Sequence, residues 1–501
     1  MSENRIKLNP NKIIHFLNKP PEDFTKKDLI HFIEKNNIEM LNFRYVGGDG
    51  KLKTLNFIIN SKEHLDRVLS TGERVDGSSL FSYIDAGLSD LYVIPRYKTA
   101  YVNPFSEIPT MDILCSYYTS KGDPLPSSPE NIVRRAHDSL KQATGLEMHA
   151  MGELEYYVFY DRDHMYPTMS QKGYHKSTPF SKWEHFRSEA MQAIAQAGGQ
   201  IKYGHSEVGD ISGGEREMEQ HEIEFLPVPI EDAADQLVIA KWILRMIGYK
   251  HGVTISFAPK ITVGHAGSGL HIHTKIVKDG KNMMVKNGEL SDTARKVIAG
   301  YLDLAPSLTA FGNTIPVSYL RLVPHQEAPT NICWGDRNRS VLVRVPLGWR
   351  SDKNMVADAN PSNGELASDK GEHQTVEFRC PDGSADVYLL LAGLAVAARH
   401  GLEMENALDI AEKLYVNVNI FDEKNKKLQK DLPQLPASCW DSADELIRQR
   451  GIYEKNDVLT QVVIDGVANQ LQGYNDKDLS ERLYRKEAEI KKLVEKFLHI
   501  S

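Results

Sequence analysis

Four short segments of the chain alternate charged or imidazole side chains with apolar ones at a spacing of two residues. They are GELEYYVF (152–159), HEIEF (221–225), GLHIHTK (269–275) and VEFRC (376–380). Successive side chains of a strand point to opposite faces of a sheet, so each segment predicts a strand with one polar and one apolar face. A single segment of this kind is typical of a sheet with one solvent-exposed face. Four such strands side by side would instead form one continuous polar surface, which we call the polar wall.

The polar positions of these segments carry many carboxylates and few imidazoles. They are Glu153, Glu155, Glu222, Glu224, His271, His273 and Glu377. A separate segment, GHSEVGD (204–210), adds His205 and Glu207 as further candidates. Hard divalent cations such as Mg²⁺ or Mn²⁺ prefer this ligand set more than zinc does. If the strands are neighbours, the sequence therefore predicts a metal-binding face.

A largely apolar stretch, RLVPHQEAPTNICWGDRNRSVLVRVP (321–346), contains four arginines and a single glutamate, Glu327. A guanidinium can hold a phosphate or a carboxylate through two hydrogen bonds and keeps its charge. Metals together with arginines indicate phosphoryl chemistry on a nucleotide or a phosphorylated substrate. The chain contains no GxxxxGK[ST] motif, and GSGLHI lacks the last glycine of GxGxxG, so a P-loop and a dinucleotide fingerprint are excluded.

The arginines of this stretch cannot all lie on one regular strand. Arg337 and Arg339 share a parity that Arg344 does not. Because side chains alternate between the faces of a strand, three arginines on one ligand require a bulge or bend between them. Otherwise one of the three has a structural partner.

Composition excludes several classes of protein. The 501 residues carry a formal net charge of −8, which gives no basic excess for nucleic acid or an anionic membrane. The four cysteines lack CxxC spacing, which argues against a zinc ribbon and a disulfide framework. The most apolar run, Val387 to Ala398, is too short to span a bilayer, and the first residues lack the apolar core of a signal peptide. We expect a cytoplasmic protein.

Residues 1–119 predict a small mixed domain, with a helix near 27–36 and two strands, 40–47 and 52–60, around the turn GDGK. The Gly/Pro/Ser-rich link SKGDPLPSSPEN (120–131) then leads into a helix that begins at Pro129 and ends at Gly145.

Residues 120–501 predict a second, larger domain in which short strands alternate with longer helices over 182–197, 230–249 and 385–403. This is an α+β pattern. Two polar stretches, 209–220 and 351–373, are expected to be surface loops. The chain is expected to close with an amphipathic helix from residue 478 that packs within the molecule.

Eight motifs in order along the chain are similar to those of one enzyme family. They are VDGSSL (75–80), GELEYY (152–157), HSEV (205–208), QHEIEF (220–225), GSGLHIH (267–273), SYLRLVPHQEAP (318–329), RNRSVLVRVP (337–346) and VEFRCPDGSADVYL (376–389). On these motifs the chain resembles type I glutamine synthetase. The resemblance implies a small N-terminal β-grasp domain, a catalytic α/β domain on a curved antiparallel sheet, and a homo-oligomer, a dodecamer. It also implies ATP-dependent ligation of ammonia to glutamate through γ-glutamyl phosphate.

The resemblance also implies a role for each matching residue. Glu155, Glu207 and Glu222 would hold one Mg²⁺ or Mn²⁺, and Glu153, His271 and Glu377 a second one. His273, Arg339 and Arg344 would bind ATP or the transferred phosphoryl group, and Arg321, Arg379 and Gly267 would bind glutamate. Asp76, with Ser79 beside it, matches the base that takes a proton from ammonium. Glu327 matches the carboxylate of a flap that closes the site.

Several positions depart from the family pattern. They are His325 and Gln326 before Glu327, Ala266 before the histidine motif, and Thr375 before Glu377. A γ-glutamyl ligase of the same fold that acts on another amine is therefore a second hypothesis. A non-catalytic structural or regulatory paralogue is a third, and a metal-dependent phosphohydrolase is the alternative that does not depend on the resemblance.

Overall fold

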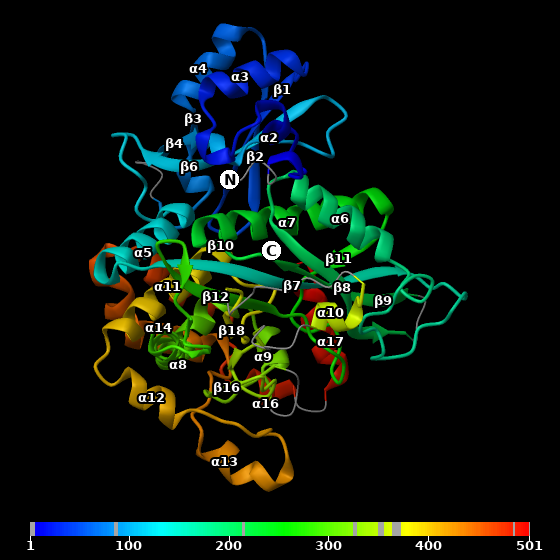
Figure 1. Ribbon diagram of the computed structural model, residues 1–501, viewed down its shortest axis with the longest axis vertical. Coiled ribbons are helices and arrows are strands. Elements are labelled where there is room, and N and C mark those ends of the chain that lie inside the picture. The colour runs from blue at the N-terminus through cyan, green and yellow to red at the C-terminus, as the bar shows by residue number, and fades with distance from the viewer. Residues whose placement is uncertain are drawn as a thin grey trace.

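The computed structural model describes residues 6–84, 89–212, 216–323, 328–348, 355–362, 372–483 and 486–499. Two sheets organise these residues, a smaller one near the N-terminus and a larger one that supports most of the chain (Figure 1). Helices cover both sheets, which confirms the α+β class.

The smaller sheet has the strand order β2-β1-β6-β4-β3, and β5 pairs with β6. Its strands are β1 (Met40–Val46), β2 (Leu52–Ile58), β3 (Glu73–Asp76), β4 (Asp90–Pro95), β5 (Tyr101–Val102) and β6 (Thr110–Thr119). β1 and β2 form the expected antiparallel hairpin, whereas β1 and β6 are parallel. Three helices accompany this sheet, α2 (Lys12–Leu17), α3 (Lys26–Lys35) and α4 (Lys62–Thr71).

The helix ends follow local sequence signals. α3 begins after Thr25, whose side chain accepts a hydrogen bond from the Asp28 backbone while the Asp28 carboxylate accepts one from the Thr25 backbone. α5 (Pro129–Thr144) begins with proline in its first turn and ends at Gly145, which has the left-handed φ of +69°. The predicted start and end of this helix are both confirmed.

The larger sheet has the strand order β16-β17-β18-β12-β7-β9-β8. The strands along this path are β16 (Trp334–Asp336), β17 (Val343–Val345), β18 (Val376–Phe378), β12 (Leu270–Lys278), β7 (Glu147–Asp161), β9 (Arg216–Phe225) and β8 (Ile201–Ile211). All neighbours are antiparallel except β16 and β17, which are parallel. Short strands complete the sheets, namely β10 (Val228–Pro229), β11 (Thr254–Ser256) and β13 (Lys281–Asn282), with the separate pair β14 (Val285–Lys286) and β15 (Glu289–Leu290).

Long helices pack against this sheet. In Figure 1, α6 (Glu184–Gln196) and α7 (Ile230–His251) lie between the larger sheet and the N-terminal domain. α8 (Asp292–Gly312), α11 (Val387–Glu403) and α14 (Cys439–Glu454) pack together, and α8 contacts β12, β17 and β18. The remaining helices are α9 (Ser318–Arg321), α10 (Met355–Ala359), α12 (Ala407–Lys413), α13 (Lys426–Asp431), α15 (Gln461–Gln472), α16 (Leu479–Leu483) and α17 (Glu487–Lys496).

The most apolar run of the sequence lies in α11, which is buried in the main hydrophobic core. Within the described ranges, no single helix is long and apolar enough to cross a membrane. Together, α11 and α12 have the length and composition of such a span, but the two helices are bent by 107° to each other.

The N-terminal domain is joined to the larger one by buried charges. The Arg96 guanidinium, after β4, donates two hydrogen bonds of 2.7 and 2.9 Å to the Asp235 carboxylate on α7. The Tyr388 hydroxyl, on α11, donates to the same carboxylate at 2.6 Å. Nearby, the Arg44 guanidinium lies 4.2 Å from the ring centre of Trp242. The division of the chain at residue 119 stays a prediction.

One of the two polar stretches expected to be surface loops is part of the larger sheet. The expected loop 209–220 is wrong: residues 209–211 end β8 and 216–220 belong to β9, with Asp210 opposite Glu219. Its polar composition was misleading because these side chains have buried partners, as Lys176 pairs with Asp210 and the Lys182 backbone donates to Glu219 at 2.8 Å. The second expected loop, 351–373, lies largely outside the described residues.

The expected terminal helix is two helices, α16 and α17. Val494 and Phe497 pack against Ile315 and Val317, so this end of the chain does pack within the molecule.

Candidate active site

The larger sheet brings the four alternating segments together as neighbouring strands. Glu153 on β7 lies opposite His271 on β12 and Glu224 on β9. Glu155 lies opposite Glu222, and His273 lies opposite Glu377. The intervening apolar side chains, which include Leu154, Ile223, Ile272 and Phe378, are fully buried in the main core.

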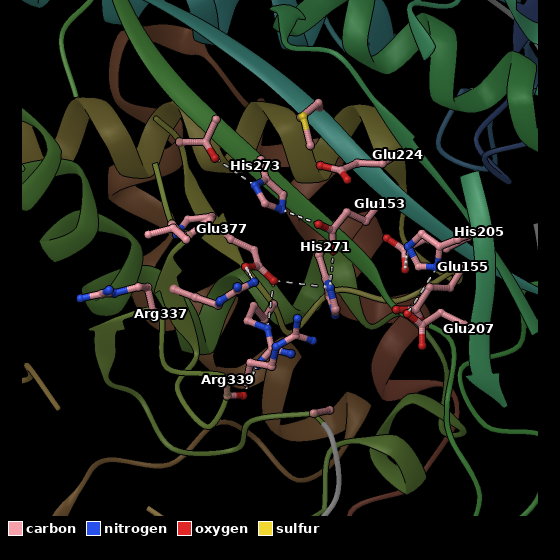
Figure 2. Close-up of a pocket in the computed structure, with 18 of the residues that line it drawn as sticks. Glu153, Glu155, His205, Glu207, Glu224, His271, His273, Arg337, Arg339 and Glu377 are labelled. Carbon is pink, nitrogen blue, oxygen red and sulfur yellow. Dashed lines mark hydrogen bonds and ion pairs between the residues drawn. The ribbon is translucent and has the colours of Figure 1, made fainter. Parts of the chain in front are cut away.

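The polar side chains therefore line one face of the sheet, and this face borders a cavity of about 1440 Å³. Figure 2 shows glutamates and histidines from β7, β8, β9 and β12 on one side of this cavity, with Arg337 and Arg339 on another.

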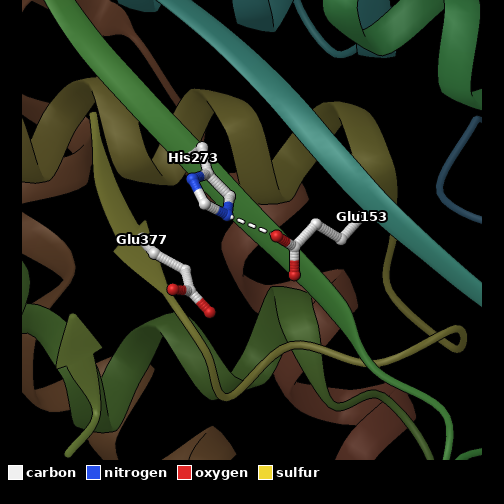
Figure 3. Close-up of side chains that lie close together, drawn as sticks. All are labelled: Glu153, His273 and Glu377. Atoms are coloured by element: carbon white, nitrogen blue, oxygen red, sulfur yellow. Dashed lines mark hydrogen bonds and ion pairs between the residues drawn. The ribbon is translucent and has the colours of Figure 1, made fainter. Parts of the chain in front are cut away.

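One cluster of possible ligands, the first cluster, consists of Glu153, His273 and Glu377 (Figure 3). One ligand atom from each lies within 4.8 Å of the others. Nε2 of His273 lies 2.8 Å from Oε1 of Glu153, and Nδ1 of His273 lies 3.0 Å from Oγ1 of Thr375. Thr375, one of the departures from the family pattern, thus contacts the outer side of this imidazole.

His271, which the resemblance assigns as the metal ligand, lies beside the first cluster. Its Nδ1 is 2.9 Å from Oε2 of Glu153 and 3.6 Å from Oε1 of Glu377. Burial acts to raise the pKa of Glu153, but the imidazoles of His273 and His271 outweigh it and hold this pKa well below its ordinary value. Glu153 is therefore ionised and contacts both histidines.

A second cluster consists of His205, Glu207 and Glu222, whose ligand atoms also lie within 4.8 Å of one another. Glu155 is close by, and its Oε2 accepts hydrogen bonds from the Gly269 backbone at 2.7 Å and from the Gln220 amide at 3.2 Å.

Negative charge accumulates at this second cluster. Burial and the neighbouring carboxylates of Glu153, Glu155, Glu207 and Glu224 raise the pKa of Glu222 well above its ordinary value. A bound divalent cation would relieve this repulsion, so the residues fit the metal that the family pattern implies.

Two arginines neutralise Glu377 on the other side of the cavity. Nη1 of Arg344 donates to Oε2 of Glu377 at 2.9 Å, and Nε of Arg379 donates to Oε1 at 3.0 Å. Arg379 also donates to the backbone carbonyl of Arg339. Arg344 and Arg379 both line the cavity, and each has further N–H groups that could donate to an anion bound there.

The parity problem of the arginines is resolved by a turn. Arg337 and Arg339 lie between β16 and β17, whereas Arg344 lies within β17. Arg337 has the left-handed φ of +55°, and its backbone N–H donates to Val345 at 2.9 Å. All three arginines line the cavity, so the expected bend between them is confirmed.

Arg321 and Gly267 lie together at the base of the cavity. Nη1 of Arg321 donates to the Cys380 carbonyl at 2.8 Å, and its Nη2 lies 3.4 Å from Nε2 of His271. A side chain at Gly267 would bring a Cβ to 2.5 Å from the Pro259 carbonyl oxygen and 3.1 Å from Cγ of Arg321. The close approach of the Pro259 carbonyl thus requires glycine here, and the Arg321 side chain packs against it.

Asp76 and Ser79 lie in the N-terminal domain, at the end of β3. The Asp76 carboxylate accepts hydrogen bonds from the hydroxyls of Ser78 and Ser79, both at 2.7 Å. These bonds hold the pKa of Asp76 below its ordinary value. Neither residue is among the described residues that line the cavity. Glu327, with His325 and Gln326, lies outside the described residues.

Several residues that line the cavity were not predicted from the sequence. Lys202 donates to Oε1 of Glu224 at 2.6 Å, and Tyr203 shares a strand face with His205 and Glu207. Parity along β8 could have pointed to Tyr203. Tyr174, whose ring contacts that of His205, lies far away in the sequence, and no spacing rule leads to it.

Comparison with known families agrees with this architecture. Residues 126–470 match the model described as glutamine synthetase, catalytic domain. Residues 37–120 match the model described as glutamine synthetase, beta-grasp domain, which confirms the expected N-terminal fold.

Individual relatives carry the same family name. Glutamine synthetase from Clostridium saccharobutylicum is 28% identical over 430 residues, covering 84% of this chain and 89% of the relative. Glutamine synthetase from Thermococcus kodakarensis is 30% identical over 396 residues, with coverage of 78% and 81%.

Among solved structures, Plasmodium falciparum glutamine synthetase is similar with a TM-score of 0.72 and 19% identity, covering 93% of this chain and 97% of that one. A structure described as a GmaS/ADP complex is similar with a TM-score of 0.70 and 17% identity, with coverage of 92% and 99%. At these identities the structures show a shared fold.

Proposed function

The chain belongs to the glutamine synthetase family, and from this premise we propose that it ligates ammonia to the γ-carboxylate of L-glutamate at the expense of ATP. A γ-carboxylate oxygen attacks the γ-phosphorus of ATP and releases ADP. Ammonia then attacks the acyl carbon of γ-glutamyl phosphate, and the C–O bond breaks to release phosphate and glutamine. The observation that carries this proposal is the pairing of two carboxylate and imidazole clusters with arginines around one cavity.

The two clusters would hold two Mg²⁺ or Mn²⁺ ions for each site. Glu153, His271 and Glu377 suit one ion, and Glu155, Glu207 and Glu222 suit the other. When bound, these cations offset the charge of bringing a carboxylate up to ATP.

The arginines complete the charge balance. Arg339 and Arg344, with His273, are proposed to bind the phosphates, and Arg344 reaches them from its contact with Glu377. Arg321 and Arg379 are proposed to bind the carboxylates of glutamate, next to the backbone of Gly267. Guanidinium groups on fixed elements hold both substrates in line, and such positioning supplies much of the rate in phosphoryl transfer.

Asp76 keeps its proposed role as the proton acceptor for ammonium, and hydrogen bonds from Ser78 and Ser79 orient its carboxylate. We propose that a second copy of the chain brings Asp76 and Ser79 to the cavity, in a homo-oligomer that we expect to be a dodecamer. Glu327 keeps its proposed role as the flap carboxylate that excludes water from the acyl phosphate.

A γ-glutamyl ligase for a larger amine is the second candidate. It is favoured by Tyr174 and Tyr203, whose rings line the cavity and are 50% and 46% exposed. Such rings could contact the apolar part of an organic amine, or its cation.

The test is to supply Mg-ATP and glutamate with ammonium or with each of a panel of amines, and to measure phosphate release together with the amide product. Ammonium is expected to give glutamine and the highest kcat/KM. Equal or greater kcat/KM with an organic amine would select the second candidate. Phosphate release without glutamate would indicate a phosphohydrolase, and no turnover with any amine would indicate a non-catalytic paralogue.

A further inference from the structure

We propose that His205 is a ligand of the second cluster's metal ion, and that this mixed imidazole and carboxylate site selects Mn²⁺ over Mg²⁺. The inference rests on the metal sites proposed above and adds a residue and a metal preference to them.

The strand geometry directs His205 at the same point as two glutamates. His205 lies directly opposite Glu222 on β9, and Glu207, two residues further along β8 in an irregular part of the strand, joins the same cluster. Nε2 of His205 lies 3.7 Å from Oε2 of Glu222, which is too long for a hydrogen bond. One ligand atom from each of His205, Glu207 and Glu222 lies within 4.8 Å of the others. Two ligand atoms on one six-coordinate ion lie about 3 to 4 Å apart, so the spacing suits shared coordination.

The hydrogen bond on the other side of the ring fixes its tautomer. Nδ1 of His205 lies 3.1 Å from the backbone carbonyl oxygen of Ser206. A carbonyl can only accept, so Nδ1 carries the hydrogen in this bond. Nε2 of the neutral ring is then left with a lone pair directed toward Glu222. A backbone carbonyl that holds Nδ1–H in this way is a recurring support of histidines that bind metals.

Neighbouring rings hold the imidazole in place. The ring centres of His175, Tyr174 and Tyr203 lie 4.5, 5.5 and 5.9 Å from that of His205. The side chain of His205 is only 14% exposed. A ligand that is already oriented loses little side-chain entropy when the metal binds, which strengthens its contribution to affinity.

The ligand chemistry gives the metal preference. Carboxylates alone suit Mg²⁺, which dehydrates reluctantly and favours oxygen. An imidazole nitrogen adds affinity for Mn²⁺ and for the later divalent metals, while adding little for Mg²⁺. His205 therefore predicts a second cluster that binds Mn²⁺ in preference to Mg²⁺.

The test uses Mn²⁺ alone, without ATP or glutamate, on the full-length protein. In a Glu153→Gln variant, which weakens the first cluster, the tightest remaining Mn²⁺ is expected to show a ¹⁴N coupling by pulsed electron paramagnetic resonance. Adding His205→Gln should abolish this coupling and weaken Mn²⁺ binding about tenfold or more. Mg²⁺ binding, measured by competition, should change less than about threefold. His149→Gln, a histidine elsewhere on the same sheet, is the matched control and should change neither.

A variant that gains affinity for one metal distinguishes a lost ligand from a misfolded protein. His205→Glu replaces the nitrogen ligand with a carboxylate, so it should raise the affinity for Mg²⁺ relative to Mn²⁺. A ¹⁴N coupling that survives His205→Gln in the Glu153→Gln background would overturn the assignment. Equal losses of Mg²⁺ and Mn²⁺ affinity in His205→Gln would overturn the preference. Because no substrate is present, either result is independent of whether the protein forms glutamine.

Discussion

Nε2 of His273 lies 2.8 Å from Oε1 of Glu153, and this contact joins β12 to β7 at the centre of the polar wall. The other oxygen of the same carboxylate lies 2.9 Å from Nδ1 of His271. Glu153 is thus the residue on which both imidazoles converge.

Replacing Glu153 with glutamine should empty the first cluster. The amide keeps the size of the side chain but removes the negative charge that a cation requires. We expect turnover and the affinity for one of the two metal ions each to fall by about a hundredfold or more. Metal titration beside steady-state kinetics measures both, and Glu147→Gln, on the same strand, is the control. Unchanged metal stoichiometry with full activity would remove Glu153 from the site.

Substitutions of the two arginines that contact Glu377 should each weaken the binding of a different substrate. Lysine keeps the charge but loses the forked geometry of the guanidinium, so Arg379→Lys should raise the KM for glutamate and Arg344→Lys the KM for ATP. We expect changes of about tenfold, corresponding to one charged hydrogen bond. Arg337→Lys, at the same cavity but without a proposed role, should change neither constant. An exchange of these effects between the two variants would contradict the proposed roles of Arg379 and Arg344.

The ion pair between the two domains should contribute strongly to stability. The Arg96 and Asp235 side chains are 20% and 8% exposed, so removing one partner leaves a buried charge. We expect Asp235→Asn or Arg96→Met to lower the free energy of unfolding by about 3–5 kcal/mol. Lys98→Met breaks the more exposed pair with Asp232 and should cost only about 1 kcal/mol or less. Chemical denaturation measures the free energy of unfolding of each variant. Equal decreases in all of them would show that the buried ion pair contributes no more to stability than the exposed one.

Lys241 should make stability depend on pH. Burial and the nearby charge of Arg245 lower the pKa of Lys241 to about 7, against the opposing effect of Asp382 and Asp386. The unfolded chain then binds more protons than the native one between pH 7 and pH 10, so the contribution of this group rises across that window. Below pH 7 the full penalty of a buried ammonium remains.

Lys241→Met should therefore remove this rise in the free energy of unfolding, which amounts to roughly 3–5 kcal/mol between pH 7 and pH 10. Unfolding measured at pH 6, 7.5 and 9 tests this. Lys250→Met, at the exposed end of the same helix, provides the comparison. The lowered pKa of Lys241 would be contradicted if the stability of the wild-type protein fell from pH 7 to pH 9 and that of Lys241→Met fell in the same way.

The sequence predicted the parts of this molecule that depend on local spacing. Alternation at Glu153, Glu222, His271 and Glu377 is a property of a few consecutive residues, so the polar wall could be predicted before the strands were known to be neighbours. The parity of Arg337 and Arg344 likewise required the turn that separates them.

Features that depend on distant contacts could not be predicted in this way. The stretch 209–220 was expected to be a loop because its charges are paired with residues some thirty positions away, such as Lys176 with Asp210. The rings of Tyr174 and His175 reach His205 from a separate segment for the same reason.

The most direct test of the proposed chemistry follows one oxygen atom. The protein is supplied with ATP, Mn²⁺ or Mg²⁺, ammonium, and glutamate labelled with ¹⁸O in its γ-carboxylate, and the released phosphate is analysed by mass spectrometry. If the carboxylate attacks ATP and ammonia then breaks the C–O bond, each phosphate carries one ¹⁸O for every glutamine formed. Unlabelled phosphate would contradict the account, because ATP would then have been cleaved by water.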